Sequence, residues 1–274
     1  MDKESLMNMA QETVKILREG KYNRGGRVKF IAKEVQNCVD KSQFCTVAEM
    51  HDKHERIARL KSPGYPTKFD VLLETSITAI LRLSYAGLKD LTVLNFASAK
   101  HPGGGFLKGS QAQEESLART SALYSSLHAF PDFYTNKTQG TTPLYSHAMI
   151  FTPVCPVFRQ DDGSFLEEPI FTNFITSPAP KKVEASEAEK KKIPNILDER
   201  IERILALAVA KKCKHLVLGA WGCGVFGNDP ELVASIFHKY LFGSYQGRFK
   251  TVCFSIWDTS EEKKIFTPFR KIFS

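Results

Sequence analysis

The 274-residue chain lacks the features of several classes of protein. Its six cysteines form no CxxC pair, which excludes a zinc ribbon and a thioredoxin-type motif. The longest uninterrupted apolar run, Ile204 to Ala210, is far shorter than the roughly 20 residues that span a bilayer. The N-terminal segment has no apolar core of the kind found in signal peptides. We therefore expect reduced thiols and a cytoplasmic location, or a nuclear one in a eukaryotic source, with no membrane contact.

Low-complexity sequence is absent as well. Apolar residues make up 42% of the chain and charged residues 25%, which excludes a collagen-like chain and argues against wholesale disorder. The chain has 38 lysines and arginines against 30 acidic residues, a net charge of +8. Such a surface favours acidic partners. No basic stretch is interleaved with aromatics in the manner of an RNA-recognition motif, so we expect no direct nucleic-acid binding.

Strands and helices alternate along most of the chain after residue 66. Apolar, β-branched runs predict strands at 91–98, 148–154, 170–177, 215–220 and 251–257. Helical periodicity predicts helices at 69–84, 113–127, 197–213 and 231–242. The QDDGS segment between the second and third strands has the composition of a hairpin turn. The alternation predicts an α/β fold with helices on both faces of a largely parallel or mixed sheet.

The first 66 residues do not show this regular alternation of strands and helices. A helix is expected up to Gly20, a strand within GRVKFIA, and a charged helix in EMHDKHERIARL, Glu49 to Leu60. Pro63, Gly64 and Pro66 then interrupt the pattern. We therefore divide the chain into an N-terminal helical extension, 1–66, packed on a single domain, 67–274. Within that domain, the charged segment 178–194 is expected to be an exposed loop.

Two glycine-rich loops each follow a predicted strand and precede a helix. They are LNFASAKHPGGGFLKGSQAQEE and LGAWGCGVFGNDP. In α/β sheets, ligands bind at the carboxyl ends of the strands. Glycine lets the backbone approach a ligand, and the helix that follows adds a positive end. Neither loop is a Walker loop or a clean GxGxxG, but together they indicate a nucleotide-diphosphate ligand.

An acidic pair follows the first loop at a fixed distance. Gly103–Gly105 and Gln113-Glu114-Glu115 are separated by seven residues. Acidic residues are favoured in the first turn of any helix, which explains one glutamate but not the preceding glycine triplet. Consecutive helical residues point about 100° apart, so a symmetric acid–base pair is not expected. One glutamate doing the chemistry while its neighbour holds a hydroxyl is the more natural arrangement.

This pattern resembles the signature of the poly(ADP-ribose) glycohydrolases. The wider string LNFASAKHPGGGFLKGSQAQEESLARTSALY is similar to their microbial type, and GAWGCGVFGND to their second ligand loop. The resemblance extends from about Glu74 to the C-terminus. It implies a macrodomain-like three-layer fold, a mixed sheet between helices, with ADP-ribose in a cleft across the strand ends. It also implies hydrolysis of the ribose–ribose bonds of poly(ADP-ribose), with ADP-ribose as product.

The resemblance assigns separate roles to the two glutamates. Glu115 becomes the catalytic acid and then the base, and Glu114 holds a ribose hydroxyl. Glu115 then needs a raised pKa in order to carry a proton before transfer. Burial and a neighbouring carboxylate raise such a pKa, whereas the N-terminus of a helix lowers it.

The expected ADP-ribose site draws on both loops and on the helix before the first strand. Its residues are Asn95, Gly103, Gly104, Gly105, Gln113, Gly222, Cys223, Gly224, Val225, Phe226, Glu74 and Thr75. Phe226 is expected against the distal ribose, and Asn95 either holds a ribose hydroxyl or braces the loop. Glu74 and Thr75 either accept the adenine amine or cap a helix. Cys223 has no histidine near it in sequence, so we expect a small loop residue and not a nucleophile.

No Cys, His or Asp grouping in the sequence has the spacing of metal ligands, so neither a metal nor a cofactor is expected. The expected partners are poly(ADP-ribose) and ADP-ribosylated proteins. Two alternatives stay open. One is a mono-ADP-ribosyl hydrolase, because the acceptor side of the site leaves no trace in the sequence. The other is a module that binds ADP-ribose without turnover, although such a module has no need of both carboxylates.

Overall fold

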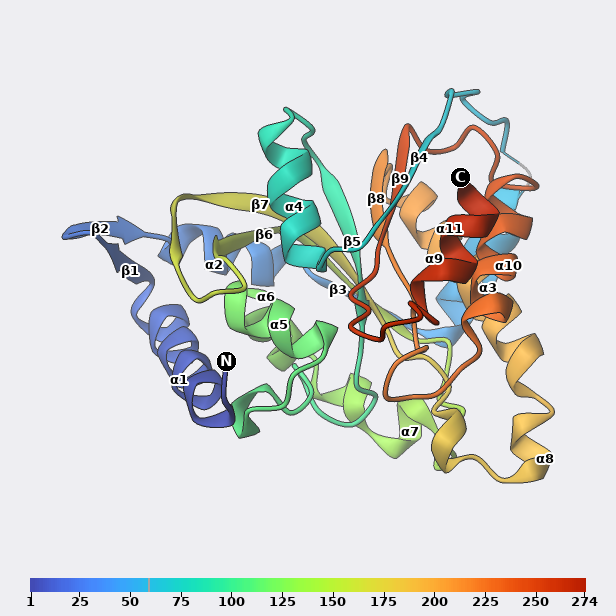
Figure 1. Ribbon diagram of the computed structural model, residues 1–274, viewed down its shortest axis with the longest axis horizontal. Helices are drawn as coiled ribbons and strands as arrows, with labels where there is room; N and C mark the ends of the chain where they lie inside the picture. The colour runs from blue at the N-terminus through green and yellow to red at the C-terminus, as the bar shows by residue number, and fades with distance from the viewer. Residues whose placement is uncertain (59) are drawn as a thin grey trace.

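A seven-stranded mixed sheet runs through the centre of the computed structural model, which describes residues 1–58 and 60–274 (Figure 1). Its strand order is β3 (Gln43–Cys45), β6 (Met149–Arg159), β7 (Phe165–Ser177), β5 (Leu91–Phe96), β8 (His215–Leu218), β9 (Thr251–Ser255) and β4 (Lys68–Leu72). From β7 to β4 neighbouring strands are parallel, whereas β6 and β3 are antiparallel to their neighbours. The predicted mixed α/β fold is confirmed.

Helices cover both faces of the sheet (Figure 1). One face carries α3 (Val47–Ala58), α9 (Ile193–Ala210), α10 (Pro230–Leu241) and α11 (Phe266–Phe273). The other carries α1 (Lys3–Glu19), α2 (Ala32–Lys41), α4 (Ser76–Tyr85), α5 (Gln113–Thr120) and α6 (Leu123–His128). Each face of the sheet and the helices that cover it enclose a hydrophobic core. Because side chains alternate along a strand, Leu94 packs in the core on the face of α9 and α10, and Val93 packs in the core on the face of α4 and α5. Among the described residues, no helix is long and apolar enough to cross a membrane.

The N-terminal 66 residues contribute to the central sheet. Helix α1 ends at Gly20 as expected, and a hairpin of β1 (Lys21–Arg24) and β2 (Arg27–Phe30) follows it. Strand β3 then pairs with β6 at the edge of the sheet. The predicted charged helix corresponds to α3, although Arg59 within it lies outside the described residues. The domain boundary at residue 66 stays a prediction.

Two of the expected helices are wrong in part. Residues 69–84 are not one helix, because β4 pairs with β9 and α4 begins only at Ser76, capped by the Thr75 side chain. The expected helix 113–127 is interrupted between α5 and α6. At this point Ser121 forms a β-bridge with Val157, and the Ala122 N–H donates to the Pro156 carbonyl at 3.0 Å. In both places the backbone pairs with a distant strand, and this pairing overrides the local helical pattern.

The charged segment 178–194 is partly helical, contrary to expectation. It contains a 3₁₀ turn at Lys182–Glu184 and helix α8 (Glu187–Lys190), which Ser186 and Glu189 start with a capping box. The Val183 N–H donates to the Phe226 carbonyl at 3.3 Å, so the segment packs on the second glycine loop. The short helices η1 (Phe106–Lys108), η2 (Pro131–Tyr134) and α7 (Asn136–Gln139) lie in other connections.

The carboxyl ends of the parallel strands meet at one edge of the sheet. The segments that leave this edge are 73–75, 97–105, 178–181, 219–226 and 256–259. A fully buried arginine on α9 holds two of the nearby loops. Arg200 donates to the carbonyls of Pro178, Leu144 and Tyr145 at 2.7, 3.0 and 3.0 Å. These bonds satisfy N–H donors of the buried guanidinium. They also hold in place the two backbone segments, around Leu144 and Pro178, that border this edge of the sheet.

Candidate active site

A cleft of about 1290 Å³ lies at this edge of the sheet. Most of the predicted ligand residues line it, namely Glu74, Thr75, Gly104, Gly105, Gln113, Glu114, Glu115, Gly222, Gly224, Val225 and Phe226. Asn95 and Cys223 are buried and lie outside this lining, as does Gly103. The two glycine loops and the acidic pair, which are more than 100 residues apart at their extremes, are therefore brought into one cavity.

Gln113 anchors the start of α5 to the end of β5. Its side-chain oxygen accepts from the Phe96 N–H at 2.9 Å, and its side-chain nitrogen donates to the Leu94 carbonyl at 2.8 Å. The same nitrogen donates to the Ser76 hydroxyl at 3.1 Å. Gln113 thus satisfies backbone groups at the end of a buried strand, and it places the two glutamates that follow at the cleft.

Glu114 is the buried member of the acidic pair, with only 2% of its surface exposed. Its carboxyl accepts from the Ser98 N–H at 2.6 Å and from the Asn95 side-chain amide at 3.3 Å. Burial, with a smaller contribution from the nearby Glu115 carboxylate, raises the pKa of Glu114 to about 8, against the lowering effect of the hydrogen bonds from Ser98 and Asn95. Glu114 therefore carries a proton at neutral pH. Asn95 also donates to the Thr176 hydroxyl at 3.2 Å, and its expected role, at a ribose hydroxyl or in bracing the loop, stays a prediction.

Glu115 is half-buried and borders the cleft. Its Oε1 accepts from the Gly105 N–H at 2.9 Å. Gly104 lies between the two carboxyls with φ +61°. A Cβ at this position would be 2.3 Å from Glu115 Oε1 and 3.2 Å from Glu114 Oε2. The two carboxyls thus converge beside Gly104, and only glycine fits there.

The raised pKa of Glu114 makes a prediction about stability. Between pH 4.5, the ordinary value, and about pH 8, the unfolded chain loses a proton that the folded protein keeps. The free energy of unfolding should therefore fall as pH rises through this window, by a few kcal/mol at about 1.4 kcal/mol per pKa unit. Glu114→Gln cannot ionise and should show a flatter profile. Urea unfolding at about pH 5 and about pH 8 measures both proteins, and parallel profiles would contradict the assignment.

The second glycine loop is built around a tight turn. Gly222 packs against Ala179 and Asn228, whose side-chain amide donates to the Gly222 carbonyl at 3.0 Å. Among the described residues, the backbone N–H groups of Gly222, Gly224, Val225 and Phe226 donate to no acceptor. Several backbone N–H groups along one loop that have no acceptor within the protein are suited to binding an anion.

Cys223 and Phe226 take different places in this loop. The Cys223 thiol is buried and lies 3.6 Å from the Trp221 carbonyl, and burial raises its pKa, so the thiol stays protonated. The Phe226 ring borders the cleft, 6.4 Å from the Tyr145 ring, with the Lys181 ammonium 5.7 Å from its centroid. Phe226 is therefore available to a ligand, whereas the Cys223 side chain is not.

Glu74 and Thr75 already have partners within the protein. Arg82 binds both oxygens of Glu74, at 2.6 and 3.1 Å, and the Ser255 hydroxyl donates to the same carboxylate at 3.2 Å. Thr75 caps α4, as one of its two interpretations has it, and donates to Asp161. A contact of either residue with adenine stays a prediction.

Three further residues of the cleft were not predicted from the sequence. Trp257 is 68% exposed and follows β9 at its carboxyl end, so its position after the last strand could have indicated it. Tyr145 and Asp161 have no such local signal. Asp161, in the β6–β7 turn, accepts from Ser116 on α5 at 2.7 Å, and this contact exists only in the folded protein.

Within 1–58 and 60–274, no group of three or more His, Cys, Asp or Glu side chains could hold a metal ion. The expectation of a reaction without metal or cofactor stays a prediction. The cleft contains paired carboxyls, glycine-rich backbone and aromatic rings. This set of groups is suited to acid–base chemistry on a ligand that carries a diphosphate.

Comparison with protein families matches residues 10–160 to "Microbial-type PARG, catalytic domain", which covers more than half of the chain. Solved structures agree. The poly(ADP-ribose) glycohydrolase from Thermomonospora curvata is 42% identical, with 98% of this chain and 100% of that chain covered and a TM-score of 0.94. Its complex with the inhibitor ADP-HPD gives 41% identity, 98% and 99% coverage, and a TM-score of 0.91.

A more distant structure gives the same answer. The poly(ADP-ribose) glycohydrolase from Deinococcus radiodurans in complex with ADP-ribose is 38% identical, covers 88% of this chain and 97% of that chain, and has a TM-score of 0.82. A search of curated protein sequences finds no match. The family match, the solved structures and the cleft together show that the chain belongs to the microbial-type poly(ADP-ribose) glycohydrolases.

Proposed function

We propose that this enzyme hydrolyses the ribose–ribose O-glycosidic bonds of poly(ADP-ribose) to ADP-ribose, with Glu115 as acid and then as base. The observation that carries the assignment is the asymmetry of the acidic pair. Glu115 borders the cleft and uses one oxygen to accept from Gly105, whereas Glu114 is buried among Ser98 and Asn95. A group that exchanges protons with substrate and water must be accessible to both.

The proposed reaction needs one proton to leave Glu115 and one to return. Protonated Glu115 donates to the leaving ribose oxygen as the C1–O bond breaks, which leaves an oxocarbenium-like centre beside a carboxylate. That carboxylate removes a proton from water as the water oxygen bonds to C1. One water is consumed, two hydroxyl groups form, and Glu115 regains its proton. Neutral Glu114 contributes no second negative charge, and it is proposed to hold a ribose hydroxyl.

The second glycine loop is proposed to bind the diphosphate. Its unused N–H groups at Gly222, Gly224, Val225 and Phe226 support this role. Phe226 is proposed to lie against the distal ribose, close to Tyr145. Binding of ADP-ribose is consistent with the Deinococcus structure, which holds that compound. The Gly103–Gly105 triplet is proposed to approach the ligand from the opposite loop while it holds the glutamates.

The experiment compares two substrates. Purified enzyme is incubated with poly(ADP-ribose) and, separately, with mono-ADP-ribosylated protein, and free ADP-ribose is measured. We expect rapid release from the polymer and little from the mono-modified protein. The reverse preference would favour the mono-ADP-ribosyl hydrolase. Binding of ADP-ribose without release from either substrate would identify a non-catalytic module.

The cysteines support a cytoplasmic location as part of this proposal. All six lie within the described residues, all are buried, and none forms a disulfide. Buried thiols in a chain of this length are typical of a reducing compartment. The polymer and ADP-ribosylated proteins are the proposed partners there.

A further inference from the structure

The positive charge of the chain is concentrated in one short segment. Residues 15–33 hold one acidic residue, Glu19, and a net charge of +6 against +8 for the whole chain. The basic residues of this segment are Lys15, Arg18, Lys21, Arg24, Arg27, Lys29 and Lys33. The segment covers the end of α1, the β1–β2 hairpin and the start of α2. The hairpin, residues 21–30 and termed the cationic hairpin below, extends away from the sheet in Figure 1.

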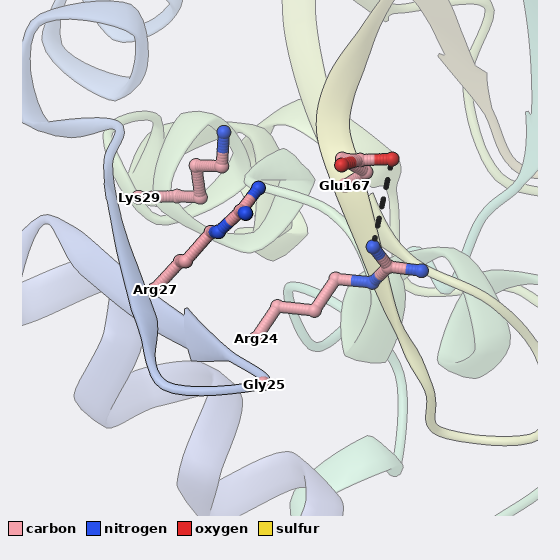
Figure 2. A pocket seen from close by; sticks show the side chains of 5 residues that line it. All are labelled: Arg24, Gly25, Arg27, Lys29 and Glu167. Carbon is pink, nitrogen blue, oxygen red and sulfur yellow. Dashed lines mark ion pairs between the residues drawn. The ribbon is translucent and has the colours of Figure 1, made fainter.

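The hairpin places three of its four basic side chains, those of Arg24, Arg27 and Lys29, on one face. Gly25 and Gly26, with φ +57° and +83°, form the tight turn, and Arg24 pairs with Arg27 across the strands. Residues that alternate along a strand share a face, so Lys29 lies on the same side as Arg27. These three side chains and Glu167 line an open pocket of about 470 Å³, and Figure 2 shows them reaching toward the strand that carries Glu167.

The acidic residues near the pocket leave much of this charge available. Arg24 lies 3.7 Å from Glu167, with both side chains about half exposed or more, and Lys29 pairs with Glu168. Arg27 has no ion-pair partner among the described residues. Exposed ion pairs contribute little to stability, so a phosphate can displace Glu167 from Arg24 at small cost.

The opposite face of the hairpin offers apolar surface. Phe30 is 75% exposed and Val28 is 48% exposed. Surfaces that bind single-stranded nucleotide chains combine basic side chains for the phosphates with exposed rings on which bases stack. Poly(ADP-ribose) presents both features in each unit, because each carries a diphosphate and an adenine.

Helix α1 connects the cleft to the hairpin. Leu6 and Met9 line the cleft, and the hairpin begins 12 residues after Met9, at Lys21. Ten of these residues lie in α1, which ends at Glu19, so at 1.5 Å per residue the helix covers roughly 15 Å of this separation. A polymer whose end unit occupies the cleft can therefore reach the hairpin with units further along the chain. Two contacts on one chain strengthen each other by raising the local concentration.

We propose that the cationic hairpin binds the part of the poly(ADP-ribose) chain that lies outside the cleft, with Arg24 and Arg27 on its diphosphates. This inference rests on the proposed function, because that function supplies the polymer. A single ADP-ribose bound in the cleft has no further unit to offer the hairpin. The hairpin therefore distinguishes polymer from single ADP-ribose.

The test compares two double variants with the same charge change. Arg24→Gln/Arg27→Gln alters the hairpin, and Arg270→Gln/Lys271→Gln alters exposed residues on α11, at the other end of the molecule in Figure 1. Both are made in a Glu115→Gln background so that the polymer stays intact, and binding of labelled polymer is measured over a range of salt. We expect the hairpin variant to bind long polymer about tenfold more weakly at low salt than the α11 variant. Its salt slope should fall by about 0.7 per lost phosphate contact.

A third variant separates stacking from charge. Phe30→Ala should weaken binding of the long polymer without changing the salt slope, because stacking releases no counterions. Free ADP-ribose should bind all of these variants equally. Equal affinity of the two double variants for long polymer would overturn the hairpin assignment.

Two controls distinguish the sources of failure. Release of ADP-ribose by the wild-type enzyme tests the proposed function separately from polymer binding. An oligodeoxyadenylate is the second probe. If it binds as tightly as the polymer and loses this affinity in the hairpin variant, the hairpin is a nucleic-acid site, which overturns the proposal.

Discussion

Glu115→Gln should reduce the release of ADP-ribose from poly(ADP-ribose) by about 10³-fold, the scale expected of an essential general acid. Glutamine keeps an oxygen that can accept from the Gly105 N–H, now at 2.9 Å from Glu115 Oε1, so the loop should stay in place. It has no proton to give to the leaving oxygen and cannot remove one from water. The loss should therefore fall on kcat. It is measured as the release of ADP-ribose from the polymer in a single turnover, with enzyme in excess over polymer ends.

The interpretation depends on a folded protein that still binds ligand. ADP-ribose affinity and the melting temperature of Glu115→Gln should match those of the wild type. Glu231→Gln, an exposed residue in the first turn of α10, removes the same charge away from the cleft and should keep full activity. If Glu115→Gln retains activity within about tenfold, the acid is another group, and Glu114 becomes the first candidate.

The second large effect is expected from Gly104→Ala. A Cβ on Gly104 would lie 2.3 Å from Glu115 Oε1, so the carboxyl must move. A displacement of about 1 Å at a reacting group costs on the order of 10² in rate, and we expect a loss of at least that size in kcat. The added methyl also meets a backbone with φ +61°, which costs about 1–2 kcal/mol of stability.

Gly87→Ala is the matched control for the backbone cost. Gly87 has φ +86°, but nothing lies within 4 Å of the position that its Cβ would take. This variant should lose about 1–2 kcal/mol of stability and keep its activity. Denaturant unfolding and kcat, measured on both variants, separate strain from displacement of the carboxyl. Equal activity of the two variants would show that Glu115 does not need its observed position.

Local signals accounted for much of the site. The glycine triplet, the seven-residue gap and the QEE sequence placed the acidic pair on the first turn of a helix that follows a buried strand. This works because a strand, a loop and a helix in succession are held together by contacts close in sequence, such as those of Gln113 with Leu94 and Phe96. The resemblance of both loops to the glycohydrolases then indicated the ligand, and the solved structures confirm the family.

The two expected helices that were wrong in part lie where the backbone pairs with a strand distant in sequence. Residues 68–72 form a strand because they pair in parallel with β9. Helix α5 ends at Thr120 because Ser121, which follows it, pairs with Val157. The helical periodicity of those segments contains no information about either partner. A pairing between residues far apart in sequence depends on the whole sheet.

The sequence by itself determined the fold class, the family and the identity of the acidic pair, because alternating hydrophobic segments and the glycine–glutamate spacing are local properties. The tertiary structure alone decided that Glu114 is the buried member, with a raised pKa, and that Glu115 borders the cleft. It also brought Tyr145, Asp161 and Trp257 to the cleft, and gathered the basic side chains of the hairpin around one pocket. Burial, and the shift in pKa that follows from it, depend on groups distant in sequence that meet only when the sheet and its helices pack.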